Sequence, residues 1–279
     1  MPAKPILAGT DGSEASLRAV EWAALEAGRR GLPLRIVTVS AMPPRMQPHH
    51  DQPATVADTL TKVSGEVLAT AASRAADVAP DVLVETDLRE GAPARTLVAC
   101  AGGGSLLVVG ARGAGGFAAM ILGSVSRYVA MHAPCPVVIA HEESRDVHRE
   151  VVAGIGDPAR AGEALGFAFE EAAARGASLL AVHAWSSSPW ADPAYQQPAS
   201  EPIAEALAPW REKYPGLQVR QDIVHGHPGR VLASFSARAD LDVIGRHDRA
   251  GHATPGVGSV QHAMLNHAHG PVAVVPTTA

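Results

Sequence analysis

Cysteine and lysine are scarce in this chain of 279 residues, and each scarcity excludes a kind of site. Its two cysteines, Cys100 and Cys135, cannot form the disulfide framework of a small secreted protein, so we expect free thiols in a reducing cytoplasm. Cys135, between two prolines, is expected to be a small buried hydrophobe. None of the lysines lies in a glycine-rich loop, which excludes a Walker-type P-loop.

Long apolar runs, a leader and a strong excess of one charge are also missing. No apolar run has the length needed to span a bilayer, and the N-terminus lacks the apolar core and cleavage site of a signal peptide. A formal net charge of -5 offers no basic surface to nucleic acid or to an anionic membrane. We therefore expect a cytoplasmic protein that binds neither, with a length that accommodates two domains.

The chain contains an internal repeat. Gly9–Ser13 matches Gly154–Pro158 at an offset of 145 residues, and Gly123–Val125 matches Gly258–Val260 at an offset of 135. The difference corresponds to one deletion between the second and third expected strands. Because the register survives over many glycines and prolines, we infer a tandem duplication with its boundary near residues 143–146. The predicted domains are residues 1–144 and 145–279.

Each copy alternates short apolar strands with helices, which predicts a parallel sheet covered by helices on both faces. The strands expected in the first copy are 5–9, 34–39, 82–85, 106–109 and 137–140. Ser13 is the expected N-cap of its first helix, which Gly31 ends. In the second copy, Asp157 is expected to cap a helix that Gly176 ends.

The second helix of the first copy is expected to bury an apolar stripe at helical spacing. That stripe consists of Leu60, Val63, Val67, Ala71 and Val78.

A glycine-punctuated loop, residues 110–124, follows the fourth strand. Gly110 and Gly113 carry no Cβ and allow the backbone to come close to a ligand. Gly123 and Ser124 place backbone N–H groups and a hydroxyl at a helix start, where phosphate oxygens are favoured. This pattern favours phosphate binding, and an ordinary connecting loop is the alternative.

The spacing Gly110, two residues, Gly113, nine residues, Gly123-Ser124 resembles the glycine signature of the universal stress protein family. Asp11 after the first strand strengthens the likeness, which covers nearly the whole chain as two tandem domains of actinobacterial type. The resemblance implies five-stranded α/β sandwich domains of the adenine nucleotide alpha hydrolase-like type, with strand order 3-2-1-4-5. In such a sheet, ligands lie at the carboxyl ends of strands one and four.

The resemblance further implies that ATP, with or without Mg²⁺, binds in the first domain. Positions matching Asp11 and Val39 contact adenine or ribose in ATP-binding members, and the glycine positions with Ser124 and Val125 hold phosphates and ribose. Val109 is either an apolar wall of the site or a core residue, and Arg112 either reaches a phosphate or is exposed. The predicted site comprises Gly9, Asp11, Val39, Val109, Gly110, Arg112, Gly113, Gly123, Ser124 and Val125.

The second copy departs from this pattern at the polar positions. Gly156 stands where the first copy has Asp11, and Asp248 stands where it has Gly113. The electrostatic repulsion between a carboxylate and a phosphate about 4 Å apart is about 1 kcal/mol in water and several kcal/mol in a drier site. Arg246 and Arg249 either offset that charge or are solvated. We therefore predict one nucleotide per chain, bound in the first domain, and a degenerate motif in the second.

These features predict a regulator or signalling protein of the stress response that binds ATP. One alternative is a nucleotide-independent scaffold with vestigial sites. The other is a slow ATPase; its activity should be weak because no catalytic triad or paired acids are identifiable. Seven of the 13 histidines fall between His225 and His269, but no cysteine and few suitably placed acids accompany them, and we predict no metal site.

Assembly is predicted from the resemblance alone. The fifth strands, 137–140 and 272–275, are expected to pair as an internal pseudo-dimer, and chains to form homodimers. Trp190 and Tyr195, in a proline-rich loop, either cover a cleft or a partner surface or pack within the loop.

Overall fold

The computed structural model describes residues 3–40, 54–113, 122–141, 147–186, 200–246 and 258–277. In the second helix of the chain, side chains are described from Asp58 onward. The chain divides into two compact units, Met1–Ala140 and His141–Ala279. The predicted boundary at residues 143–146 falls outside the described residues, as do Trp190, Tyr195, Asp248 and Arg249. The predicted domain limits and pairing of the fifth strands therefore stay predictions.

The first unit alternates five strands and four helices. Its elements in chain order are β1 (Ile6–Gly9), α1 (Glu14–Arg30), β2 (Leu34–Ser40), α2 (Ala54–Val78), β3 (Val84–Glu90), α3 (Pro93–Ala101), β4 (Leu106–Gly110), α4 (Ser124–His132) and β5 (Val137–Ala140).

The described part of the second unit repeats this order and also contains the 3-10 turns η2 and η4. Its elements are β6 (Glu150–Gly154), η2 (Pro158–Arg160), α5 (Gly162–Arg175), β7 (Ser178–Trp185), α6 (Glu201–Lys213), β8 (Val219–His225), α7 (Pro228–Phe235), η4 (Ser236–Arg238), β9 (Leu241–Arg246), α8 (Ser259–His267) and β10 (Val272–Pro276).

The strand order confirms the fold predicted from the sequence. The first unit has the order β3-β2-β1-β4-β5 and the second β8-β7-β6-β9-β10, which is 3-2-1-4-5 in both. Strand β1 pairs in parallel with β2 and β4, so Gly9 lies opposite both Val37 and Val109. The last residues of β1 and β4 therefore meet at one edge of the sheet.

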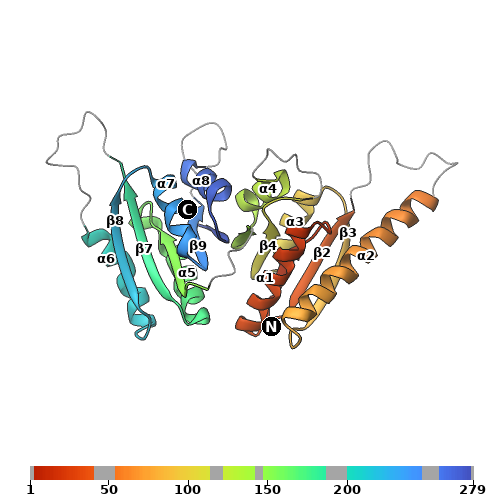
Figure 1. The fold of residues 1–279 in the computed structure, drawn as a ribbon, viewed down its shortest axis with the longest axis horizontal. Helices are drawn as coiled ribbons and strands as arrows, with labels where there is room; N and C mark the ends of the chain where they lie inside the picture. Colours follow the sequence, from red (N-terminus) through yellow and green to blue (C-terminus); the bar gives the residue numbers. More distant parts are fainter. Residues whose placement is uncertain are drawn as a thin grey trace. The chain divides into compact units, whose positions relative to one another are not determined.

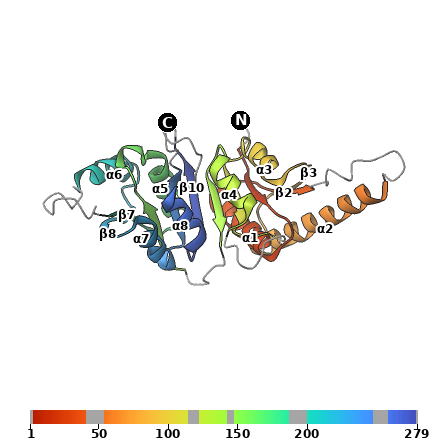
Figure 2. The same cartoon turned by 90° about the horizontal axis from the view of Figure 1, so that it is seen from above.

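Helices cover both faces of each sheet. In the first unit α1 and α2 pack together over β1 to β5, and α3 packs with α4 on the opposite face. Figure 1 shows α1 and α2 in front of the strands, and Figure 2 shows α3 on the other side. Helix α5 packs on α6, and α7 on α8, in the second unit. None of the helices in the described ranges is long and apolar enough to span a membrane.

The ends of α1 follow the capping rules that the sequence predicted. The Ser13 side chain accepts a hydrogen bond from the Ser16 N–H, and Gly31 ends the helix in the left-handed region at φ 61°. Gly176 ends α5 in the same way, at φ 59°. Asp157, however, caps the 3-10 turn η2 through the Ala159 N–H, and α5 begins only at Gly162.

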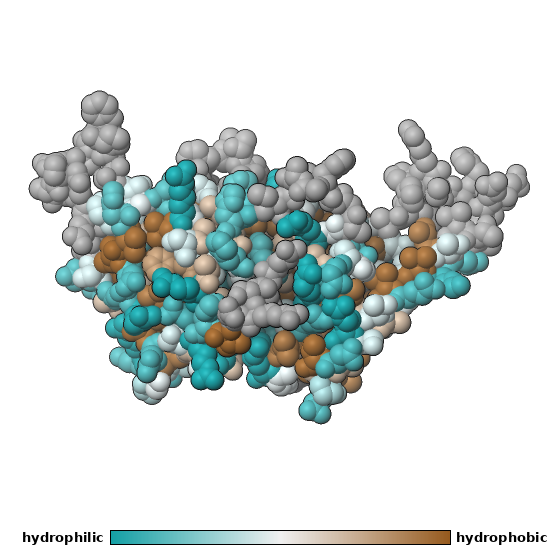
Figure 3. Space-filling model, viewed as in Figure 1, coloured by the Kyte–Doolittle hydropathy of each residue, from teal (hydrophilic) through white to brown (hydrophobic). Residues whose placement is uncertain are grey.

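The predicted apolar stripe of α2 is partly wrong: Ala71 is buried and Leu60 and Val67 are half-buried, but Val63 and Val78 are exposed. The buried side chains are Ser64, Leu68, Ala71 and Ala75, whereas Val63 is 51% exposed. The helix thus presents small residues to its neighbours, and it leaves larger apolar side chains among hydrophilic ones on its outer surface (Figure 3). The apolar pattern predicted that the valines are buried, because hydrophobicity does not indicate how closely two elements pack against each other.

Strand β3 begins and ends later than the sequence predicted. It runs from Val84 to Glu90 rather than over 82–85. Among the described residues, the strand lies at the edge of its sheet and pairs with β2 alone, and all seven of its side chains are exposed or half-buried. An edge strand is held by backbone hydrogen bonds and tolerates polar side chains, which is why the apolar pattern missed it.

One buried carboxyl interrupts the apolar interior of the second unit. Asp242 of β9 lies opposite Val272 and Val152, is 1% exposed, and stands where the first unit has Leu107. Among the described residues, neither of its oxygens has a hydrogen-bond partner. Burial in these surroundings raises the pKa of Asp242 well above its usual range, because the charged form is poorly solvated.

We predict that Asp242 makes the stability of the second unit fall as pH rises. Above the unfolded pKa of about 3.9, the unfolded chain loses a proton that the folded unit retains, until pH reaches the raised folded pKa. Asp242→Asn, which cannot titrate, should show a flatter profile and higher stability at the alkaline end. Urea unfolding at several pH values, monitored by tryptophan fluorescence, measures the pH profile and the stability at the alkaline end. Three of the four tryptophans lie in this unit and report its unfolding. Identical pH profiles for the two proteins would contradict the prediction.

Candidate functional site

The adjacent carboxyl ends of β1 and β4 open into a cavity of about 490 Å³ in the first unit. Helix α1 follows β1 on one face of the sheet and α4 follows β4 on the other, so the chain leaves a crevice between them. The volume lies within the range of about 300–1,000 Å³ that is typical of small-molecule sites. The cavity is lined by all ten residues of the predicted site, and also by Thr10, Ser16, Val37, Pro93, Leu97 and Ser126.

One wall of the cavity is apolar. Val37 and Val39 project from β2, Val109 from β4, and Pro93 and Leu97 from α3. Val109 is 4% exposed, so it serves both as a core residue and as part of this wall. The sequence analysis missed three of these residues, although Val37 and Val39 share a face by strand alternation. Pro93 and Leu97 reach the cavity only because α3 crosses the ends of β1 and β2.

Hydroxyl groups hold Asp11 at the end of β1. The Ser13 N–H and the Ser13 hydroxyl both donate to Asp11 Oδ1, at 3.0 and 2.6 Å. The Asp11 N–H donates to Ser16 Oγ at 3.3 Å, and the Ser16 hydroxyl donates to the Ser13 carbonyl at 2.9 Å. Ser16 Oγ also lies 3.0 Å from Thr10 Oγ1, which accepts from the Gly12 N–H. Ser16 and Thr10 are buried, whereas Asp11 and its hydrogen bonds with Ser13 are exposed.

The other oxygen of the Asp11 carboxylate is turned toward the glycine loop. Asp11 Oδ2 lies 2.5 Å from the point where a Cβ on Gly113 would be. Any larger residue at position 113 would collide with this carboxylate. The structure thus brings together the two residues, distant in the sequence, on which the predicted site depends.

Gly110 has a packing role that the sequence analysis did not predict. A Cβ at Gly110 would lie 2.7 Å from the Ala15 carbonyl oxygen and 3.1 Å from the Ser16 nitrogen. These are backbone atoms of α1, so the absence of a side chain allows β4 to approach the helix. The contact with α1 by itself requires glycine at this position, and the close approach of a ligand to Gly110 stays a prediction.

The start of α4 closes the site on the side of the glycine loop. Gly123 precedes the helix and offers no side chain to cap its first backbone N–H groups, while Ser124 and Val125 line the cavity. The Ser126 hydroxyl donates to the Gly110 carbonyl at 2.7 Å, and the Gly123 N–H donates to the Ala111 carbonyl at 2.8 Å. The two ends of the loop are therefore tied together, and residues 114–121 lie outside the described part of the chain.

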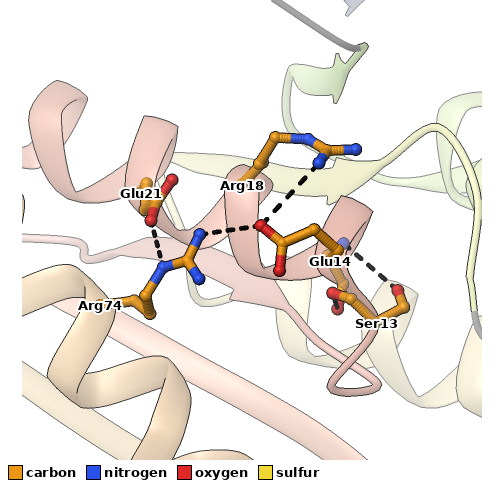
Figure 4. A network of polar contacts seen from close by, with 6 residues as sticks. Ser13, Glu14, Arg18, Glu21 and Arg74 are labelled. Atoms are coloured by element: carbon orange, nitrogen blue, oxygen red, sulfur yellow. Dashed lines mark hydrogen bonds and ion pairs between the residues drawn. The ribbon is translucent and has the colours of Figure 1, made fainter.

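Ion pairs fasten the first turns of α1 to α2 beside the site (Figure 4). The Arg74 guanidinium of α2 donates to Glu21, and also to Glu14 at 3.0 Å, while Arg18 lies 3.9 Å from the same Glu14 oxygen. The hydrogen bond with Glu21, followed by that with Glu14, raises the pKa of Arg74 above its usual value. All four side chains are partly exposed, so these pairs orient the helices more than they stabilise them.

Metal and thiol chemistry find no support in the described ranges. These residues include no group of three or more histidine, cysteine or acidic side chains that could hold a metal ion. Neither cysteine forms a disulfide, and Cys135 is buried, as expected.

Each unit thus has a doubly wound parallel sheet with the order 3-2-1-4-5, and the first carries a cavity where that order reverses. The sequence profile of the universal stress protein family matches residues 2–141 and 148–276. The chain belongs to this family, with a copy of its domain in each half.

Known proteins of full length resemble the chain throughout. A universal stress protein of Mycobacterium tuberculosis (strain H37Rv) is 34% identical over 290 residues, which span 96% of both chains. The crystal structure of a universal stress protein from Archaeoglobus fulgidus covers 99% of both chains with a TM-score of 0.75 and 21% identity, which supports the fold. Another universal stress protein, solved in complex with cAMP, is 31% identical and covers 51% of this chain with a TM-score of 0.40. That ligand is a property of that protein.

We predict that Gly110→Ala destabilises the first unit, because its Cβ would overlap backbone atoms that cannot rotate away. Overpacking of this kind costs about 1–3 kcal/mol. Urea unfolding followed by far-UV circular dichroism measures the loss. Gly102→Ala is the matched control, since its Cβ meets its nearest neighbour at an ordinary 3.6 Å. Equal unfolding midpoints for the two variants would show that the contact between β4 and α1 is not tight.

Proposed function

We propose that the first unit binds ATP in the cavity at the ends of β1 and β4, and that the protein acts as a nucleotide-responsive regulator in the stress response. The observation that carries this proposal is the meeting of Asp11 with Gly113 and the start of α4 around one cavity. A carboxylate, an apolar wall and a bare helix start match the three parts of a nucleoside phosphate.

The proposed roles follow from the chemistry of each wall. The valines of β2 and β4, with Leu97, offer an apolar surface to the adenine ring. The Asp11 carboxylate accepts hydrogen bonds from ribose hydroxyls or from the adenine amino group. Gly123, Ser124 and the first N–H groups of α4 bind phosphate oxygens, which the helix dipole favours. Arg112, which also lines the cavity, adds a positive charge on this side.

A divalent cation is proposed to arrive with the triphosphate rather than to occupy a site of its own. Asp11 is the single acidic side chain among the described lining residues, and one carboxylate does not make a Mg²⁺ site without phosphate oxygens. The described lining also contains no lysine or histidine, so any hydrolysis of bound ATP should be slow. We therefore propose that the protein acts as a regulator rather than as an enzyme. Its location in the cytoplasm and the homodimerisation of the chain are also part of the proposal.

The second unit is proposed to bind no nucleotide. Gly156 provides no carboxylate at the position of Asp11, and Asp157 is engaged as the cap of η2. Asp248, which answers Gly113, lies outside the described residues, so its proposed effect rests on charge alone.

Calorimetric titration with ATP, with and without Mg²⁺, tests the proposal. We expect one nucleotide per chain. Two equivalent sites would refute the degenerate second unit, and no binding at any concentration would favour a nucleotide-independent scaffold.

Gly113→Asp should weaken ATP binding by at least about tenfold, because 1.4 kcal/mol corresponds to tenfold and two carboxylates at about 4 Å repel by 1–4 kcal/mol. The new side chain also collides with Asp11 Oδ2. Gly103→Asp is the matched control: it adds the same charge at an exposed turn before β4, at the opposite edge of the sheet. An affinity for Gly113→Asp equal to that of the control would remove Gly113 from the site.

A further inference from the structure

The duplication provides an internal comparison for the hydroxyl network around Asp11. The offset of 145 residues pairs each member of the network with a residue of the second unit. Every partner lacks a side-chain hydrogen-bonding group: Thr10 corresponds to Ile155, Asp11 to Gly156, Ser13 to Pro158, and Ser16 to Ala161. The hydroxyl network is therefore absent from the second unit, where an acid stands one position later, at Asp157, and accepts from the Ala159 N–H.

Other polar contacts at the same edge of the sheet are kept in both units. The Thr38 hydroxyl donates to the Thr10 carbonyl at 2.9 Å, and Nδ1 of the corresponding His183 contacts the Ile155 carbonyl at 2.9 Å. The Ser126 hydroxyl donates to the Gly110 carbonyl, and the corresponding Gln261 amide donates to the Gly245 carbonyl at 3.2 Å. These contacts brace the ends of the strands, and both units retain them with different side chains.

This contrast separates the requirements of the fold from those of the site. The second unit forms the same sheet without the network, so the sheet does not require Ser13 and Ser16, although Ser13 also caps α1 through the Ser16 N–H and α5 begins later than the position that matches the start of α1. What the first unit has in addition is the Asp11 carboxylate, and the network is centred on it. Two donors converge on Oδ1, and the buried Ser16 accepts from the Asp11 N–H. Both the backbone and one oxygen of Asp11 are thereby held.

We propose that Ser13 and Ser16 are positioning residues that hold the Asp11 carboxylate with Oδ2 over Gly113, ready to receive the donor group of a nucleoside. This inference rests on the proposed function, since it deepens the role of Asp11 in that site. A carboxylate fixed before binding loses less side-chain freedom when the ligand arrives, which raises affinity by about threefold to tenfold per immobilised side chain. Ser13 acts through its N–H and hydroxyl, and Ser16 by anchoring the turn that carries Asp11.

A double-mutant cycle on ATP affinity tests this role. Ser13→Ala and Ser16→Ala should each weaken binding about threefold to tenfold when Asp11 is present, and should cause no further loss in the Asp11→Ala background. Ser13→Thr, which retains the hydroxyl, should restore the affinity of the wild type. Ser105→Ala is the control, because its hydroxyl donates to the Pro5 carbonyl at the opposite edge of the sheet. An equal loss in both backgrounds would mean that the serines act on the fold, and would overturn the proposal.

A second measurement does not depend on nucleotide binding. Crystal structures of nucleotide-free Ser13→Ala and Ser16→Ala should show the Asp11 carboxylate turned away from Gly113 or in more than one rotamer. Ser16→Ala is the milder change, because the second unit accommodates Ala161 at this position. An Asp11 side chain unchanged in both variants would overturn the positioning role even if ATP binds. Conversely, a wild-type protein that binds no ATP would refute the proposed function, and the carboxylate position would still decide this inference.

Discussion

The parallel pairing of β1 with β4 is the constraint on which the rest of the first unit depends. These strands are neighbours in the sheet although two other strands separate them in sequence, and the helices that follow them lie on opposite faces. The described residues leave a crevice open at this edge of the sheet. Asp11 leaves one strand at this edge and Gly110 ends the other, so a cavity with polar and apolar walls forms without any special device.

Glycine supports this arrangement in two physically distinct ways. At Gly110 it lets the backbone of β4 approach the backbone of α1, which sets how narrow the crevice is. At Gly113 it leaves room for the Asp11 carboxylate, which sets where a charge faces the cavity. A motif of regularly spaced glycines therefore combines a packing requirement with an electrostatic one.

The second unit shows how far the fold tolerates the loss of the site. It keeps the strand order and the braces at the strand ends while replacing every hydroxyl of the Asp11 network. It even accommodates a buried carboxyl, Asp242, in a central strand where the first unit has a leucine. Sheet pairing and helix packing tolerate these changes because backbone hydrogen bonds and the remaining apolar side chains sustain them.

The sequence by itself determined the duplication, the strand order through the family resemblance, the caps of α1 and the ten residues that later proved to line one cavity. These rest on local chemistry or on motif spacing, which a linear chain displays. Only the tertiary structure decided the buried face of α2, the polar edge strand β3, the contribution of Pro93 and Leu97, and the contact that requires Gly110 to be glycine. Each of these depends on how closely two elements approach after folding, and that distance is written in no single segment of the chain.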